Sequence, residues 1–300
     1  MRNRKGSLPL HFAQGLLMGT ADIIPGVSGG TMALIVGVYE RLIDSISAFF
    51  SGVAAPLRGD LRGSREAFGR VQWGLVIPLA LGLVTAIGIA SRIIPPLMER
   101  YPAQARGLFF GLVAASIAIP WMRLRARGPR ELAIVAAGAV TAYVLVGLPA
   151  TQGGADPSLL RVFGSAAVAI CAMILPGVSG AFLLEVMGMY RPTLEALHEL
   201  DVPYVLVFAA GAATGIGLFS KLLDWLLDHH HDTTMAALVG LMAGSLRALW
   251  PWQEESRAVR LPGPGDPVAA VLLLALAGFV VVAALAAWEA RQLRARAGRQ

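Results

Sequence analysis

The feature that most constrains this chain is a run of helix-breaking residues between two apolar segments. Residues 21–31 read Ala-Asp-Ile-Ile-Pro-Gly-Val-Ser-Gly-Gly-Thr, and proline removes a backbone donor while glycine weakens a helix. The core Pro-Gly-Val-Ser-Gly returns at 176–180, which is 151 positions later and again in an apolar setting. At the same spacing Gly37 corresponds to Gly188. We interpret the recurrence as an internal duplication.

The composition indicates an integral membrane protein. Of the 300 residues, 56% are hydrophobic and 15% are charged, and the mean hydropathy is +0.65. This is more apolar than a soluble domain needs to fill one core. The formal charge of +6 comes largely from arginines in short polar segments and at the two ends, a pattern typical of anchors beside a membrane. We therefore expect the membrane as a partner, and no nucleic acid.

Two further features limit the class of protein. The basic start at residues 1–5 precedes an apolar segment, but no small-residue cleavage site follows it before Pro25, so we expect the N-terminus to be retained. Cys171 is the single cysteine, which excludes a disulfide framework and a cysteine metal cluster.

The apolar segments predict an all-α polytopic membrane protein with two similar halves, since about 20 apolar residues span the roughly 30 Å hydrocarbon core. In the first repeat, 1–150, we predict a broken hairpin at 8–50 and membrane helices at 73–94, 103–121 and 131–148. In the second repeat, 151–300, we predict a broken hairpin at 159–190 and membrane helices at 202–227, 233–250 and 267–288. The first of these membrane helices is expected to end at Arg92-Ile93-Ile94-Pro95-Pro96.

A second block of sequence repeats away from the motif. Eight positions match or nearly match without a gap at a spacing of 129, from Gly82 with Gly211 to Ser116 with Ser245. The spacing differs from 151 because the first half carries a basic insert around 57–70, where the second half has only a short connector. The insert is expected to form a loop or a surface helix.

The distribution of arginines decides how the two broken segments are oriented. If both crossed the bilayer, the basic insert would lie opposite the basic N-terminus, against the tendency of positive loops to face the cytoplasm. If both are re-entrant, the termini, the insert and the loop at 123–130 all face the cytoplasm, and only 247–260 places arginines outside. We therefore predict an inverted repeat with six spanning helices and two re-entrant hairpins that enter from opposite faces.

Irregular backbone at membrane depth must be enclosed, because each unpaired N–H or C=O group in hydrocarbon costs several kcal/mol. A helix that starts after Pro-Gly presents free amide donors and partial positive charge, which suit a phosphate or a carboxylate. The alternative is that both motifs are tight turns of a packed bundle. The candidate substrate-binding residues of the motifs are Pro25, Gly26, Ser28, Gly29, Gly30, Thr31, Pro176, Gly177, Ser179 and Gly180.

Charged residues inside apolar segments are functional candidates, because one at a helix centre costs about 2.5–3.5 kcal/mol on insertion scales. Asp22 precedes the first motif and Glu185 follows the second, so each hairpin has one carboxylate for a coupling proton. A helix cap, or a pair with Arg161 or Arg41, is the simpler alternative. Cations near helix ends also snorkel toward the interface. The candidate cations for a phosphate are Arg41, Arg92 and Lys221.

Three consecutive histidines, His229–His231, lie between two aspartates. Consecutive residues of a helix point in different directions, so these histidines form a poor single metal site. We expect no metal, no cofactor and no catalytic residue.

The motif residues resemble a known family. Residues 21–31, with Gly-Val-Tyr-Glu-Arg-Leu-Ile at 37–43 and Leu-Pro-Gly-Val-Ser-Gly at 175–180, are similar to the polyprenyl-phosphate transporter (PopT) family of bacterial membrane proteins. The resemblance covers nearly the whole chain, although the second hairpin is less regular. It implies a lipid transporter in the inner (cytoplasmic) membrane that translocates undecaprenyl phosphate and returns this spent carrier lipid of cell-wall synthesis to the inner leaflet.

The closest alternative is a membrane undecaprenyl-diphosphate phosphatase, because those enzymes also use paired re-entrant hairpins and a Pro-Gly-x-Ser motif. They place an arginine directly after the serine, whereas this sequence has Gly29 and Gly180 there. The cation that would stabilise phosphoryl transfer is therefore missing. A transporter of a small anion and an uncharacterised scaffold are the remaining alternatives, and neither readily explains two anion-suited motifs in one lipid-facing fold.

Overall fold

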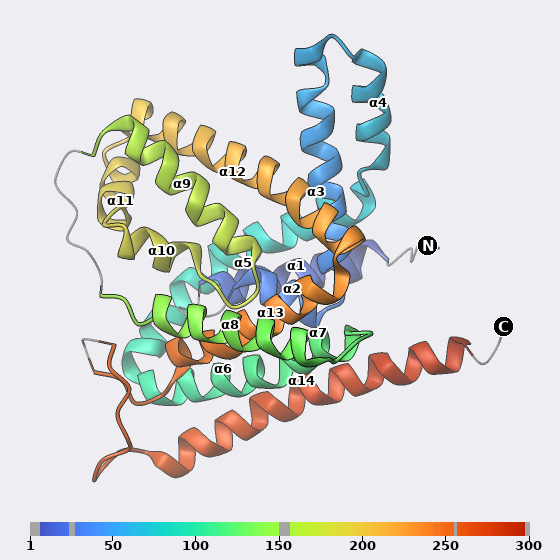
Figure 1. The fold of residues 1–300 in the computed structure, drawn as a ribbon. Helices are drawn as coiled ribbons and strands as arrows, with labels where there is room; N and C mark the ends of the chain where they lie inside the picture. The colour runs from blue at the N-terminus through green and yellow to red at the C-terminus, as the bar shows by residue number, and fades with distance from the viewer. Residues whose placement is uncertain (1–6, 24–27, 150–156, 255–256, 298–300) are drawn as a thin grey trace.

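The computed structural model describes residues 7–23, 28–149, 157–254 and 257–297. The regular secondary structure of the described residues is helical, apart from an isolated antiparallel bridge between Gln253 and Val259. Most of the helices form one bundle, and α3 and α4 stand out from it (Figure 1). The predicted all-α fold is therefore confirmed.

The helices divide between the two halves of the chain. Those of the first half are α1 (Leu8–Asp22), α2 (Gly29–Ile35), α3 (Tyr39–Ala54), η1 (Pro56–Arg58), α4 (Leu61–Arg70), α5 (Trp73–Arg100), α6 (Pro102–Ser116), α7 (Ala118–Arg123) and α8 (Pro129–Leu145). Those of the second half are α9 (Leu159–Ile174), α10 (Gly180–Val186), α11 (Tyr190–His198), α12 (Val202–His229), α13 (His231–Ser245), η2 (Leu246–Leu249) and α14 (Val268–Ala297).

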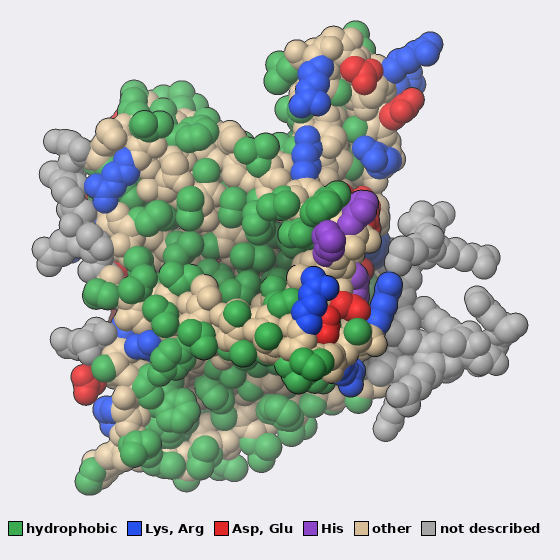
Figure 2. Space-filling model, in the orientation of Figure 1, with side chains coloured by type: hydrophobic (Ala, Val, Ile, Leu, Met, Phe, Trp, Pro, Cys, Tyr) green, Lys and Arg blue, Asp and Glu red, His purple; other side chains and the backbone are tan. Residues whose placement is uncertain are grey.

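The described residues contain three segments that are long and apolar enough to cross a membrane, whereas six spans were predicted. They are α5, α6 continued by α7, and α12. The outer face of α5 carries Ile77, Leu81 and Val84, which are 51%, 58% and 66% exposed, and hydrophobic side chains cover much of the surface in Figure 2. Apolar surface on this scale marks contact with a membrane. The chain is a membrane protein.

The predicted end of the first membrane helix is wrong. α5 continues through Pro95 and Pro96 and ends at Arg100. Proline keeps a helical φ and removes only its own N–H donor, and prolines are tolerated in membrane helices because other groups satisfy the freed carbonyls. Two missing donors therefore do not end a helix of 28 residues.

The segment predicted as one helix at 103–121 is interrupted after Ser116. The Ser116 hydroxyl donates to the carbonyl of Val113 at 2.7 Å, and α7 follows. In the second half the Ser245 hydroxyl donates to the carbonyl of Met242 at 2.8 Å, and η2 follows. Both serines are fully buried. α6 and α13 therefore end at equivalent serines, each with its hydroxyl bonded to the carbonyl three residues before it.

Glycines allow the helices to approach closely, and the close contacts come in pairs. On α5, Gly82 lies against the carbonyl of Phe12 in α1; on α12, Gly211 lies against the carbonyl of Phe163 in α9. A Cβ at either glycine would overlap that carbonyl, which is the reason small residues line membrane helix contacts. The two glycines are 129 positions apart and the two phenylalanines 151 apart, which are the two spacings of the sequence repeat.

Two further close pairs each join one helix from each half. α6 packs along α14, where Gly111 lies against the carbonyl of Ala275, and α13 packs along α8, where Gly240 lies against the carbonyl of Val135. Gly111 and Gly240 also belong to the repeated block. The two halves are therefore interleaved rather than placed side by side.

The basic insert at 57–70 forms η1 and α4, and α4 makes a helical hairpin with the preceding α3. α3 packs on α12, where Phe50 lies against Gly217, and then continues beyond the bundle. After η1 the chain turns at Gly59, whose φ of +75° favours glycine. α4 then packs back along α3. The hairpin is the part of Figure 1 that stands out at the top.

Candidate functional site

Each Pro-Gly motif leads into a short helix that its own serine caps. The Ser28 Oγ accepts a hydrogen bond from the N–H of Thr31 at 3.2 Å at the start of α2. The Ser179 Oγ accepts one from the N–H of Phe182 at 3.4 Å at the start of α10. Serine is favoured at this position because its hydroxyl satisfies a donor of the first turn. Two predicted site residues lie outside the described part of the chain, namely Pro25 and Gly26.

The two motifs contact each other directly. The N–H of Gly177 donates to the Oγ1 of Thr31 at 2.9 Å, and the Ser28 Oγ donates to the carbonyl of Leu175 at 3.4 Å. Thr31 is fully buried and Ser28 is 2% exposed. A Cβ on Gly30 would lie 2.6 Å from the carbonyl oxygen of Ile174, so only glycine permits this approach. Residues almost 150 positions apart in sequence thus form one centre.

The second motif is also seated against the end of α13. Gly177 has a φ of +85°, which residues with a Cβ rarely adopt. A Cβ there would lie 2.8 Å from the Oγ of Ser245 and 2.9 Å from the Cα of Met242. Glycine is therefore required both for the backbone conformation and for the space available.

A pocket of about 150 Å³ lies beside this centre. Residues of α1, α2, α3, α5, α9 and α12 form its walls, and Asp22 and Tyr39 are the polar side chains among the described residues that line it. The Tyr39 hydroxyl donates to the carbonyl of Ile174 at 3.3 Å. The sequence analysis did not single out Tyr39 as a site residue, although it joins the two halves at the pocket.

The Asp22 carboxylate is bound to the start of α2. Its Oδ1 accepts a hydrogen bond from the N–H of Gly29 at 2.6 Å, and a Cβ on Gly29 would lie 2.7 Å from both carboxylate oxygens. This amide is one of the donors at which a phosphate was predicted to bind. Carboxylate and phosphate oxygens accept hydrogen bonds from the same kind of donor, so the two groups would compete for Gly29.

The three predicted cations are not among the residues that line the pocket. The Nε of Arg41 donates to the Oε1 of Gln72 at 2.8 Å. Arg92 is exposed on α5, and Lys221 is half-buried on α12. In this conformation the charged group at the centre is the carboxylate of Asp22.

Glu185, the other predicted carboxylate, pairs with an arginine that sequence analysis missed. Its Oε2 accepts a hydrogen bond from the Nη2 of Arg257 at 2.6 Å, and the guanidinium lies 4.6 Å from the centre of the Phe182 ring. Arg161, the partner considered for Glu185, donates instead to the carbonyl of Met187. Glu185 and Arg257 are 72 positions apart in the sequence, so no local sequence pattern could pair them.

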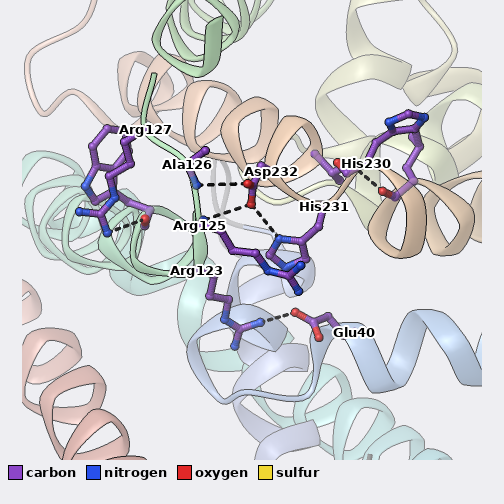
Figure 3. Close-up of polar contacts among 11 residues, drawn as sticks. Glu40, Arg123, Arg125, Ala126, Arg127, His230, His231 and Asp232 are labelled. Atoms are coloured by element: carbon purple, nitrogen blue, oxygen red, sulfur yellow. Dashed lines mark hydrogen bonds and ion pairs between the residues drawn. The ribbon is translucent and has the colours of Figure 1, made fainter. Parts of the chain in front are cut away.

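A second ion pair ties α3 to the end of α7. The Nη1 of Arg123 lies 2.7 Å from the Oε1 of Glu40 (Figure 3). Close by, the carboxylate of Asp232 accepts hydrogen bonds from the N–H groups of Arg125 and Ala126, each at 3.1 Å. The bond from Arg125, supported by those from the His231 ring and the N–H of Ala126, lowers the pKa of Asp232 below its ordinary value. These contacts fix the loop between α7 and α8.

The three consecutive histidines do not converge. The Nδ1 of His229 lies 3.0 Å from the carbonyl of Trp225, whereas the Nδ1 of His231 lies 3.3 Å from the Oδ1 of Asp232. Figure 3 shows His230 directed away from His231. Among the described residues no three possible ligands are grouped so that they could hold a metal ion.

Comparison with known proteins identifies the family. Residues 18–262, which include both motifs, match the family described as VCA0040-like, undecaprenyl phosphate translocase-like. The chain belongs to this family. It is 37% identical over 246 residues to the polyprenyl-phosphate transporter of Vibrio cholerae serotype O1 (strain ATCC 39315 / El Tor Inaba N16961). The aligned region covers 81% of this chain and 78% of that protein. No solved structure matches the chain.

A second relative is more distant. The chain is 28% identical over 258 residues to the polyprenyl-phosphate transporter of Staphylococcus aureus (strain NCTC 8325 / PS 47). The aligned region covers 81% of this chain and 86% of that protein. The family predicted from the motif residues is confirmed. Both relatives are named as transporters, so the family groups the chain with transporters and not with enzymes.

Proposed function

We propose that this chain translocates polyprenyl phosphate, with undecaprenyl phosphate as the expected lipid, across the bacterial cytoplasmic membrane. The relatives in the translocase-like family carry that substrate in their names. The observation that carries the proposal is the direct contact of the two motifs beside a pocket whose charged group, Asp22, is bound to a backbone amide. Return of the lipid to the inner leaflet for re-use is the direction that we propose.

We propose an inverted repeat of 1–150 and 151–300, with three spanning helices and one re-entrant hairpin in each half and both termini in the cytoplasm. Support comes from the paired glycine contacts of α1 with α5 and of α9 with α12. The pairing of α6 with α14 and the pairing of α13 with α8 also correspond to each other. In both, a helix that carries a glycine of the repeated block packs on the last long helix of the other half. An arrangement of this kind places the two motifs together at one centre.

The phosphate headgroup is proposed to bind by exchange with the carboxylate of Asp22. While Asp22 is ionised, it holds the N–H of Gly29 at 2.6 Å. A protonated acid is a weaker acceptor than a carboxylate, so proton uptake by Asp22 would free this amide for a phosphate oxygen. The proton would thereby be coupled to binding of the anion. Glu185, tied to Arg257, is the second proposed proton carrier.

The other proposed substrate contacts surround this step. The remaining residues of the two motifs would enclose the headgroup, and the cations Arg41, Arg92 and Lys221 would attract it along its path. The prenyl chain would stay in lipid, because the outward faces of α5 and α12 are apolar. Only the polar end of the substrate would then have to cross the protein.

The test is leaflet exchange of a labelled polyprenyl phosphate in liposomes that contain the purified protein. Gly29→Val places a side chain against the Asp22 carboxylate, and Ser28→Leu removes the cap and fills a buried site. Both variants should abolish exchange. Gly88→Val is the matched control, because a Cβ at Gly88 meets nothing within 4 Å, and it should exchange at the rate of the parent protein.

The same liposomes separate the alternative functions. Normal exchange in both motif variants would falsify the site. Release of inorganic phosphate from undecaprenyl diphosphate would favour the phosphatase, and uptake of inorganic phosphate without exchange of the lipid would favour the transporter of a small anion.

A further inference from the structure

The hairpin of α3 and α4 has no helical equivalent of its size in the second half. Where α3, η1 and α4 extend from Tyr39 to Arg70, the second half has only α11, of nine residues. In Figure 1 the hairpin extends outside the bundle and runs across the direction of α14. The proposed inverted repeat makes α14 a spanning helix, so the hairpin would lie along the membrane surface rather than through it.

The hairpin is held rigid by its own contacts. The Ser64 hydroxyl of α4 donates to the carbonyl of Gly52 in α3 at 2.8 Å. A Cβ on Gly52 would lie 2.9 Å from the Phe68 ring, so glycine allows the two helices to pack closely. The Asp60 carboxylate caps α4 by accepting a hydrogen bond from the N–H of Gly63 at 2.7 Å. The outer end of the hairpin is therefore ordered and presents fixed surfaces.

One surface of the hairpin is apolar and exposed. Phe49 is 36% exposed and Val53, one helical turn further along α3, is 47% exposed. Beyond the turn, Leu57 is 87% and Leu61 is 74% exposed. Leucine side chains so open to solvent at the end of a projecting element indicate that another apolar phase covers them.

Aromatic side chains connect this surface to the membrane-facing part of the bundle. The ring of Phe49 lies 5.6 Å from that of Phe68 and 6.2 Å from that of Trp73. Trp73 in turn lines an apolar groove of about 660 Å³ between α1 and α5, with Phe12 and Ile77 among its other walls. Since α5 is a candidate membrane span, the apolar side of the hairpin continues a surface that faces lipid.

Basic side chains lie beside the apolar ones on the hairpin. Arg58, Arg62 and Arg65 are exposed, and the segment 57–70 contains four arginines against two acids, one of which is the capping Asp60. Figure 2 shows Lys and Arg side chains, in blue, on the projecting hairpin at the top of the molecule. Basic side chains beside apolar ones are typical of elements that lie in the headgroup layer of anionic membranes.

We propose that the α3–α4 hairpin is a docking surface for an anionic phospholipid leaflet. Its leucines and Phe49 enter the acyl-chain boundary, and its arginines bind the phosphate groups of neighbouring lipids. Continuity with the apolar groove favours a lipid surface over a soluble acidic protein, which would cover the arginines but leave the leucines in water. The proposal does not depend on the identity of the transported substrate.

The test uses the full-length protein in liposomes, with Cys171→Ala removing the native thiol. An environment-sensitive dye is attached at Leu61→Cys, and in a second sample at Glu66→Cys, which lies about 140° further around α4. With brominated acyl chains as quenchers and phosphatidylglycerol in the bilayer, we expect strong quenching at position 61 and little at position 66. Replacing Arg58, Arg62 and Arg65 together by Gln should reduce quenching at 61 to the value found in pure phosphatidylcholine.

Two outcomes would overturn the proposal. A dye at 61 that is quenched by aqueous iodide as readily as the dye at 66, in both lipid mixtures, would leave the hairpin in water and favour a soluble partner. Quenching at 61 that is the same with and without the three arginines would remove the role of the anionic headgroups. Thermal unfolding of each labelled variant in detergent confirms that the fold is retained.

Discussion

At the scale of single residues, Thr31 joins the two halves of the molecule at their centre. Its Oγ1 accepts the hydrogen bond from the N–H of Gly177, and its own side chain is fully buried. Thr31→Val keeps the shape of the side chain but leaves that amide without its partner. Because an unsatisfied buried donor costs about 1–3 kcal/mol, we expect a lower unfolding temperature in detergent and slower lipid exchange.

Thr20→Val is the matched control for Thr31→Val. Among the described residues, the Thr20 hydroxyl bonds to the carbonyl of Leu16 in its own helix, at 2.8 Å, and its loss leaves none of their amides without an acceptor. An equal loss of stability in the two variants would show that the bond between the motifs contributes nothing specific.

Asp22 is the residue at which a proton would be coupled to transport. Asp22→Asn retains an oxygen that can accept from Gly29 but cannot take up a proton near neutral pH. We expect the rate of polyprenyl-phosphate exchange in liposomes to become independent of pH, whereas the parent protein responds to it. Glu185→Gln, at the other proposed carrier, is measured alongside. A pH profile that is unchanged in both variants would remove the two carboxylates from the coupling role.

Residue types at the centre were easier to predict than their partners. The Pro-Gly-Val-Ser-Gly pattern marks Ser28 and Ser179, because a serine before a helix caps it locally. The pairs of Thr31 with Gly177 and of Glu185 with Arg257 depend on how distant helices pack. No spacing along the chain encodes such contacts, so the sequence identified members of the site and not its bonds.

At the scale of elements, the loop between α7 and α8 depends on one carboxylate. The hydrogen bond from the N–H of Arg125, with those from the His231 ring and the N–H of Ala126, lowers the pKa of Asp232 below its usual value of 3.8. A lowered pKa in the folded state means that ionised Asp232 stabilises the fold at pH values above 3.8 and loses this effect as the pH falls through the lowered value.

Asp232→Asn tests this dependence. The variant should unfold at a lower temperature than the parent protein at pH 7, and the difference should shrink as the pH is reduced below 3.8. Thermal unfolding in detergent at a series of pH values measures it. A difference that stays constant across the series would show that the charge of Asp232 does not support the loop.

Helix positions followed well from apolar runs, and helix ends did not. α5 continues through Pro95 and Pro96, because proline in a long membrane helix removes few bonds. The helix predicted at 103–121 breaks after Ser116, whose buried hydroxyl binds its own backbone. The basic insert was expected as a loop or a surface helix, and it contains the helix α4. The packing of α4 on α3 depends on contacts such as Ser64 with Gly52, which the sequence did not predict. These ends are set by packing and hydrogen bonds, which hydropathy does not report.

At the scale of the whole molecule, the interleaving of the halves predicts that neither is stable alone. α6 packs on α14 and α13 packs on α8 through glycines that leave no space for another side chain. When 1–150 and 151–300 are expressed separately, each should be lost from the membrane by degradation. When they are expressed together, a tag on one half should purify the other. Recovery of either half alone as a folded monomer would contradict the interleaving.

The exchange of helices between the halves also has an evolutionary consequence. A forerunner with one copy of the repeat would have lacked the neighbour that each of its last helices requires, and could have found it only in a second molecule. Under the inverted repeat that we propose, such a forerunner would have worked as a pair of identical chains inserted in opposite directions, and the fusion of two genes would have made that partnership permanent.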